Sequence, residues 1–437
     1  MFSGCGGLAL GFQQAGFKIT HGIELVEAAA NTANYNLSIK KGEKAQHICG
    51  DITKLSPEIF QDKIGPNGCI VIGGPPCQAY SLAGRAKINS VREEGTYLDD
   101  KRGFLFEDFL RFGIGLDAKA IVMENVRQCV NYGKINVPER VAEILERHGY
   151  KVFWTVLNSA DYGVPQIRER MILFAIKGDA EIIMPQPTHS GKSMDNLYAY
   201  VGLEDLQQHP HFVMPKHKRR KDPCWVTVKD AISDLPSLHP TSKNKYRAHS
   251  VKMGLPYRTD AQNEYQEKMR NSSGICTGHV YRNTPRDFPI FEQMQEGDNY
   301  VRAAEIAEEL FKKECARLNI RANTEEYENL KNKIVPPYST EKFLSKWKKM
   351  ESNKPSYTLV AHLSVDTYSH IHPWEARGIS VREAARLQSF PDDFIFQGNM
   401  GDAYKQIGNS VPPLMAEGIA KALRRMLSTR SDSHNEQ

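Results

Sequence analysis

The stretch IVIGGPPCQAYSLAG, residues 70–84, joins a short apolar run to two glycines, two prolines and a cysteine. The apolar run from Ile70 to Ile72 predicts a buried strand, which the two glycines end. Cys77 then follows at the exit of this strand, where the prolines restrict the backbone. A free cysteine is most often a small buried apolar residue. The rest of the chain must therefore show whether this thiol has a chemical role.

Short apolar runs alternate with amphipathic segments throughout residues 1–185. The runs that predict strands are GFKITHGIELV, HICGDIT, GCIVIGGPP, AIVMENV, VFWTVLNSADYG and RMILFAIKG. Segments such as 104–112 and 138–148 predict helices between them. This alternation predicts an α/β fold in which helices cover both faces of a parallel sheet. Ligands of such sheets bind at the carboxyl ends of the strands, where GGPPC and Glu124-Asn125 lie.

The composition changes after Pro185 and changes back near residue 356. Residues 186–355 are polar and irregular, and they include the basic run HKRRK at 217–221. Residues 356–427 resemble the first part again, with a final helix expected at 414–427, and the Ser/Asp/Asn-rich tail 428–437 predicts disorder. The sequence therefore predicts one α/β domain, 1–185 and 356–427, with residues 186–355 as an insertion.

The positive charge is concentrated in the middle of the chain. The 437 residues contain 57 Lys and Arg against 52 Asp and Glu, for a net charge of +5. Residues 186–360 hold 28 of the cations and 22 of the acids, so their net charge of +6 exceeds that of the whole chain. This pattern is typical of a polyanion-binding module within a neutral scaffold. The HKRRK run alone fits a solvated loop equally well.

Other features exclude several classes of protein. No apolar run approaches the roughly 18 residues of a membrane span, and the start MFSGCGGLAL lacks the pattern of a signal peptide. The eight cysteines form no Cys-x-x-Cys pair, so neither a metal site nor a redox dithiol is predicted. We therefore expect a reduced, cytoplasmic protein that has no contact with membranes.

The stretch FSGCGGLALGF, residues 2–12, places three glycines directly before an apolar helix. Such a loop lets a ligand approach the backbone closely. Glu24 follows about twenty residues later, where a carboxylate suits paired ribose hydroxyls, and Asp51 could accept a hydrogen bond from an adenine amino group. Each acid alone is more often a strand-end or cap residue. Together they predict a site for an adenosine-containing cofactor, and a phosphate-cradling NTPase loop is disfavoured because no Lys-Ser/Thr follows the glycines.

A second group of residues could carry the chemistry. Glu124 ends the apolar run AIVM, where an unpaired carboxylate would be costly. Arg168 and Arg170 alternate as in a strand, so both side chains are expected on one face. The simplest interpretation is a structural ion pair with Glu124. Alternatively, the thiol of Cys77 adds to an electron-poor ring while the carboxyl group and the guanidiniums stabilise the developing charge.

Six ordered motifs resemble those of the prokaryotic cytosine-5 DNA methyltransferases. They are FSGCGGL, GGPPCQ, MENV, QIRER, SVREAARLQSFP (380–391) and YKQIGNSVPP (404–413). The resemblance covers most of residues 1–185 and 356–427. It implies a Rossmann-like methyltransferase sheet interrupted by a target recognition domain, which would be residues 186–355.

The resemblance also implies a role for each residue of the motifs. Cys77 would add to carbon 6 of a flipped-out cytosine, and Glu124 would bind ring nitrogen 3 and the amino group. Asn125 would hold that loop, Arg170 would contact the ring carbonyl, and Arg168 would lie near the thiolate and a phosphate. Carbon 5 would then take a methyl group from S-adenosylmethionine. The residues implied for the cofactor are Phe2, Gly4, Gly6, Gly7, Glu24, Asp51, Ile52, Pro76, Leu105, Asn409 and Ser410.

The expected partner is double-stranded DNA, so the protein would associate with the nucleoid. A cognate restriction endonuclease is a second candidate partner.

Two alternative functions remain. One branch of the family methylates cytosine in transfer RNA, but it carries Cys-Phe-Thr where this chain has only Ile275-Cys276-Thr277, and its insertion is smaller. The other alternative, an inactive DNA-binding regulator, is disfavoured by the intact catalytic motifs.

One departure from the family concerns the start of the sequence. In the family a central strand precedes the FSG motif, whereas this sequence begins at Met1-Phe2. We expect that the sequence starts late, with a strand supplied by another polypeptide as the alternative. Either case would leave a slot in the sheet between the neighbours of that strand.

Overall fold

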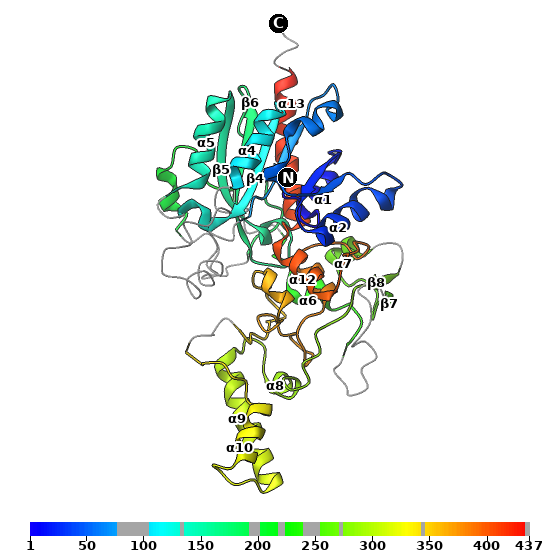
Figure 1. Ribbon diagram of the computed structural model, residues 1–437, viewed down its shortest axis with the longest axis vertical. Helices are drawn as coiled ribbons and strands as arrows, with labels where there is room; N and C mark the ends of the chain where they lie inside the picture. The colour runs from blue at the N-terminus through cyan, green and yellow to red at the C-terminus, as the bar shows by residue number, and fades with distance from the viewer. Residues whose placement is uncertain are drawn as a thin grey trace. The chain divides into compact units, whose positions relative to one another are not determined.

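The computed structural model describes residues 1–76, 105–131, 135–191, 202–216, 223–238, 254–270, 274–341 and 346–432. The chain forms two compact units (Figure 1). Unit 1 comprises Met1–Trp225 and Ser410–Gln437, and unit 2 comprises Val226–Asn409. No helix in the described ranges is both long enough and apolar enough to cross a bilayer.

The unit boundaries, at 225 and 409, lie about 40 and about 53 residues later than the composition changes at 185 and 356. Asp161 of unit 1 contacts both ends of the segment 188–225. Its side chain accepts a hydrogen bond from Trp225 Nε1 (2.8 Å), and its carbonyl accepts from the amide of Thr188 (2.8 Å). The segment before Asn409 belongs to unit 2 because its buried Arg386 pairs with Asp234 (3.3 Å).

Among the described residues of unit 1, six strands form two sheets. A parallel pair contains β1 (Gly22–Glu24) and β2 (His47–Cys49). The second sheet has the order β3-β4-β6-β5, with β3 at Ile70–Gly73, β4 at Ala120–Val126, β5 at Tyr150–Asn158 and β6 at Glu169–Lys177. Strand β6 is antiparallel to both of its neighbours, so the prediction of a parallel sheet was wrong there. The turn η7 (Ser159–Tyr162) is too short for the crossover that parallel strands require.

The first three residues lie between the two sheets. The amino group of Met1 donates to the carbonyl of Ile72 in β3 (2.7 Å), and the amide of Ser3 donates to the carbonyl of Ile23 in β1 (3.1 Å). In the described part of the chain no strand separates β1 from β3. The start of the FSG motif is therefore held by one strand of each sheet.

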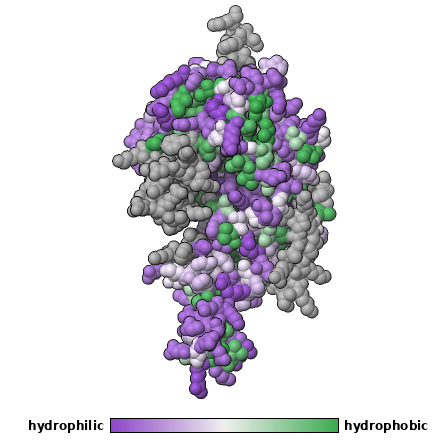
Figure 2. All heavy atoms as spheres, in the orientation of Figure 1, coloured by the Kyte–Doolittle hydropathy of each residue, from purple (hydrophilic) through white to green (hydrophobic). Residues whose placement is uncertain are grey.

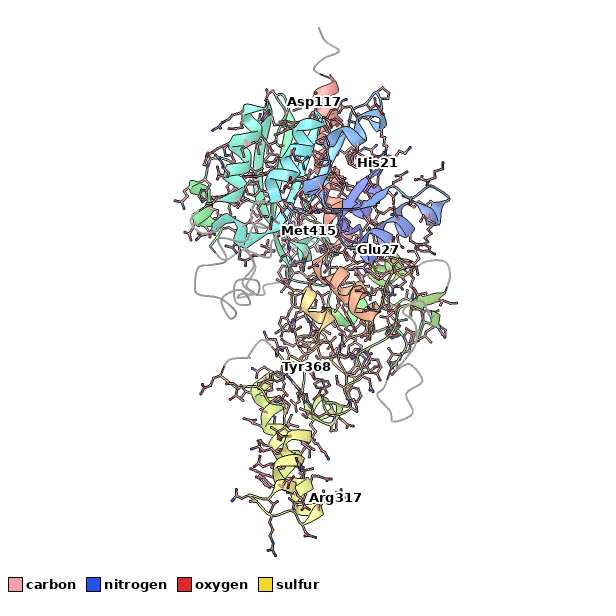
Figure 3. The ribbon with its side chains drawn as sticks, in the orientation of Figure 1. His21, Glu27, Asp117, Arg317, Tyr368 and Met415 are labelled. Atoms are coloured by element: carbon pink, nitrogen blue, oxygen red, sulfur yellow. The ribbon has the colours of Figure 1, made fainter. Side chains whose placement is uncertain are left out.

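Helices from both ends of the sequence complete unit 1. Figure 1 shows the C-terminal helix α13 (Pro413–Asp432) beside α1 (Gly7–Gln14). Gly11 makes this contact possible, because a Cβ there would lie 2.4 Å from Cβ of Ala416. Met415, labelled in Figure 3, is fully buried on α13. The other helices are α2 (Glu27–Leu37), α4 (Leu105–Gly115), α5 (Val137–Arg147), η1 (Ile39–Lys41), η2 (Ile52–Lys54), η3 (Pro57–Lys63), η6 (Arg127–Asn131) and η8 (Glu204–Gln208).

Helix α13 extends through Asp432, into the tail for which the sequence predicts disorder. The helices expected at 104–112, 138–148 and 414–427 are present, and their ends move by no more than a few residues.

Unit 2 is mostly helices and loops. Its elements are α6 (Val228–Ile232), β7 (Gly254–Pro256), α7 (Glu264–Met269), β8 (Ile275–Thr277), α8 (Phe288–Gln293), α9 (Tyr300–Leu318), α10 (Glu325–Ile334), η9 (Ala361–Ser364), α11 (Val381–Leu387) and α12 (Met400–Asn409). The visible surface of α9 and α10 is mainly hydrophilic (Figure 2). The base of α9 packs on an aromatic cluster in which Trp347 stacks on Tyr368 at 4.8 Å. Tyr368 is labelled in Figure 3.

Two buried histidines should make unit 2 sensitive to acid. Burial lowers the pKa of both His279 and His370 to about 4, below the value of about 6.5 expected in the unfolded chain. Between these two values the unfolded chain binds more protons, so the free energy of unfolding should fall as the pH falls. Urea unfolding between about pH 7 and about pH 4.5 should show this loss, and it should be smaller for His370→Gln. Equal pH dependence in the two proteins would contradict the assignment.

Candidate active site

The glycine loop exposes its backbone before α1. Gly4 and Gly6 have positive φ angles of 53° and 95°. A Cβ at Gly6 would lie 2.9 Å from Leu37, whereas a Cβ at Gly4 would meet nothing within 4 Å. Phe2 is a non-glycine residue with φ of 49°, a conformation that costs of the order of 1 kcal/mol and is typical of functional sites. The loop therefore offers open space at Gly4 and strained backbone beside it.

Glu24 joins this loop to the end of β1. Its two carboxylate oxygens accept hydrogen bonds from the amide of Gly4 (2.8 Å) and from that of Val26 (2.9 Å). Leu25, between Glu24 and Val26, is 68% exposed. The sequence interpretation missed Leu25, although an apolar residue directly after a strand-end carboxylate was the available signal. The glycine loop is thus bonded to the carboxylate of Glu24, and the exposed side chain of Leu25 comes next in sequence.

Asp51 follows β2 and caps η2. Its Oδ1 atom accepts hydrogen bonds from the amide (3.0 Å) and the hydroxyl (2.8 Å) of Thr53, and these bonds lower the pKa of its carboxyl group. The neighbouring Ile52 is buried, and its carbonyl accepts a hydrogen bond from Arg111 of α4 (2.8 Å). Leu105 is the first residue of α4. Helix α4 therefore supports the loop that presents Asp51.

Glu124 lies near the carboxyl end of β4 and contacts two predicted motifs. Its Oε1 atom is 2.9 Å from Nε of Arg170, and the two side chains are 12% and 11% exposed. A Cβ at Gly74 would lie 2.6 Å from Glu124 Oε2, so only glycine fits there without a shift. The buried Asn125 donates from Nδ2 to the carbonyl of Pro75 (3.3 Å). The GGPP loop is thus held against the carboxyl group of Glu124.

Arg168 has different partners from Arg170. It is 2% exposed, and its Nη2 atom donates to the carbonyl of Ser410 (3.1 Å). Ser410 also hydrogen-bonds the thiol of Cys5 in the glycine loop, while burial raises the pKa of that thiol to about 12. The ion pair with Glu124 that the sequence suggested therefore involves Arg170. Ser410 links Arg168 to the glycine loop, a contact across 242 residues for Arg168 that no local pattern indicates.

The structure describes only some of the remaining predicted site residues. Gly7 begins α1, and Pro76 is the last described residue before the gap at 77–104, so Cys77 lies outside the described residues. The whole HKRRK run at 217–221 also lies outside the described residues. Asn409 is exposed at the end of α12 in unit 2.

Comparison with known sequences identifies the family. The sequence profile described as C-5 cytosine-specific DNA methylase matches residues 1–425. The chain belongs to this family. The recognised motifs are therefore confirmed as those of cytosine-5 DNA methyltransferases, and the protein is an enzyme of that class.

Individual relatives agree with this result. M.OihORF3336P of Oceanobacillus iheyensis is 50% identical over 434 residues, which cover 97% of this chain and 94% of the relative. The type II methyltransferase M.DdeI of Desulfomicrobium norvegicum is 29% identical over 97% of this chain and 87% of its own length. A solved structure of a prophage-encoded Escherichia coli protein superposes with a TM-score of 0.63 at 23% identity, covering 98% of each chain. The expected α/β methyltransferase fold is confirmed.

The close approach of Gly74 to the carboxyl group of Glu124 gives a testable prediction. Gly74→Ala should lower the single-turnover methylation rate by about tenfold to a hundredfold, because the new methyl group displaces the carboxyl group of Glu124. The control is Gly65→Ala, at an exposed position where a Cβ meets nothing within 4 Å. Equal rates for the two variants, with unchanged unfolding midpoints, would show that the position of the Glu124 carboxyl group is unimportant.

Proposed function

We propose that the protein methylates carbon 5 of a cytosine flipped out of a specific duplex DNA sequence, using S-adenosylmethionine and a covalent Cys77 adduct. The observation that carries this proposal is the carboxyl group of Glu124, held between Arg170 and the GGPP loop that leads to Cys77. A carboxyl group near the end of an apolar strand suits the polar edge of a planar base. Base flipping would deliver that base to the site.

The residues would act on the cytosine in a defined order. The Cys77 thiolate adds to carbon 6, and the electron pair moves toward nitrogen 3, where Glu124 supplies a proton. Arg170 hydrogen-bonds the ring carbonyl and stabilises the charge that develops. Carbon 5 thereby becomes nucleophilic and accepts the methyl group. Loss of the carbon-5 proton then expels Cys77 and restores the aromatic ring.

The loop side of unit 1 fits S-adenosylmethionine, which would supply an activated methyl group. The open space at Gly4 admits a ligand to the backbone, Glu24 presents a carboxylate to ribose hydroxyls, and the exposed Leu25 offers an apolar surface for the adenine ring. Asp51 would accept a hydrogen bond from the adenine amino group. The other residues proposed to hold the cofactor are Phe2, Gly6, Gly7, Ile52, Pro76, Leu105, Asn409 and Ser410.

DNA recognition is proposed for residues 186–355, because the excess positive charge lies there. The name of M.DdeI describes a type II methyltransferase. By analogy, a restriction endonuclease that cuts the same sequence is the proposed functional partner, and the cytoplasmic nucleoid is the proposed location. The transfer RNA and inactive-regulator alternatives are outcomes of the experiment below.

A trapping experiment tests the covalent step. Duplex DNA containing 5-fluorocytosine should form a stable adduct with the wild-type protein, because carbon 5 then carries no removable proton. Cys77→Ser should form none, because a serine hydroxyl is rarely ionised near neutral pH, and it should still bind DNA. Cys69→Ser, at a partly buried cysteine outside the proposed recognition segment, is the control and should react normally. An adduct that survives Cys77→Ser would exclude Cys77, and an adduct with transfer RNA alone would favour that substrate.

Substitutions in the HKRRK run test whether its cationic side chains contact DNA phosphates. Replacing Lys218, Arg219, Arg220 and Lys221 by Gln should weaken binding to cognate and scrambled duplexes alike. Each lost phosphate contact should also reduce the dependence of log affinity on log salt concentration by about one unit. The measurement is affinity against salt concentration on both duplexes. An unchanged slope would indicate a solvated loop, and a loss confined to the cognate duplex would indicate base reading.

A further inference from the structure

Arg127 and Glu169 form a second ion pair near the one formed by Glu124 and Arg170. Arg127 Nη1 is 2.9 Å from Glu169 Oε2, and the two side chains are 26% and 15% exposed. Glu169 and Arg170 are successive residues of β6, so their side chains point to opposite faces of the sheet. Arg127 directly follows β4 and begins η6. The ends of β4 and β6 are thus joined by one ion pair on each face.

The backbone of Glu169 connects the two pairs. Its carbonyl accepts a hydrogen bond from Arg170 Nη1 (2.6 Å), while Arg170 Nε lies 2.9 Å from Glu124 Oε1. Arg127 therefore holds the side chain of the residue whose carbonyl holds the guanidinium of Arg170. A shift of residue 169 would move both the carbonyl and the strand end from which Arg170 projects.

This arrangement matters most when the base is bound. In the proposed reaction Glu124 turns to the cytosine ring, so its ion pair with Arg170 weakens. The Glu169 carbonyl is then a contact within β6 that still orients Arg170. A guanidinium that must meet a ring carbonyl needs this orientation before the thiolate adds, since misplacement by about 1 Å can lower a rate by about a hundredfold.

We propose that Arg127 and Glu169 are positioning residues for methyl transfer. Their ion pair fixes the Glu169 carbonyl and, through it, the direction of the Arg170 guanidinium. This inference rests on the proposed function, because it assumes that Glu124 and Arg170 meet the cytosine ring. Neither Arg127 nor Glu169 is proposed to touch the substrate.

The test compares Arg127→Gln and Glu169→Gln with a variant of an exposed ion pair elsewhere in unit 1. Arg140 and Glu143 of α5 also form an ion pair (3.4 Å), but both side chains are 53% exposed, so Arg140→Gln is the control. Each test variant should lower the single-turnover methylation rate about tenfold to a hundredfold at saturating DNA and S-adenosylmethionine. DNA affinity and the thermal midpoint should stay near the wild-type values. Arg127→Lys, which keeps the charge, should recover part of the rate.

The outcomes separate this inference from the proposal on which it rests. A wild-type protein that forms no adduct with 5-fluorocytosine DNA would overturn the proposed function, and this inference with it. Normal adduct formation by the wild type, together with unchanged single-turnover rates in both test variants, would overturn the positioning role alone. Rate losses that match the fall in thermal midpoint, or no recovery with Arg127→Lys, would also overturn it.

Discussion

The carboxyl group of Glu124, near the end of an apolar strand, imposes the main constraint on the catalytic unit. A carboxyl group that is 12% exposed requires a polar partner, and Arg170 supplies it from the neighbouring antiparallel strand. The same carboxylate leaves room only for a glycine at position 74. The composition of the GGPP loop, the antiparallel direction of β6 and the pairing of the arginine are thus linked through one charged group.

A second constraint is that unit 1 is assembled from both ends of the chain. Ser410 contacts Cys5 of the glycine loop and Arg168, and α13 packs on α1 at Gly11. The glycine loop and Arg168 are therefore joined by a residue that follows unit 2 in sequence. Each unit nevertheless has a core of its own.

Local sequence patterns predicted the elements of unit 1 but not their directions or distant partners. The apolar runs located all six strands, because buried strands differ clearly from the amphipathic helices between them. The same runs could not show that β6 is antiparallel, since a buried strand has the same pattern in either direction. Strand-end placement brought Glu124 near Arg170, whereas the partner of Arg168 depends on the packing of α13. The unit boundary at Trp225 likewise involves contacts between residues distant in sequence, such as its hydrogen bond to Asp161.

The structure of unit 2 depends on buried ion pairs more than on a sheet. It has only one short two-stranded sheet among its described residues, and its interior contains fully buried charges. Arg386 lies between Asp234 and Asp392, and Arg377 pairs with Glu383 (2.7 Å). Removing one partner of such a pair costs about 3–5 kcal/mol, because the other charge is left buried alone. Since these internal contacts fix the packing, the polar surface residues carry little of the fold. Substitutions at the polar surface of unit 2 should therefore leave this internal framework intact.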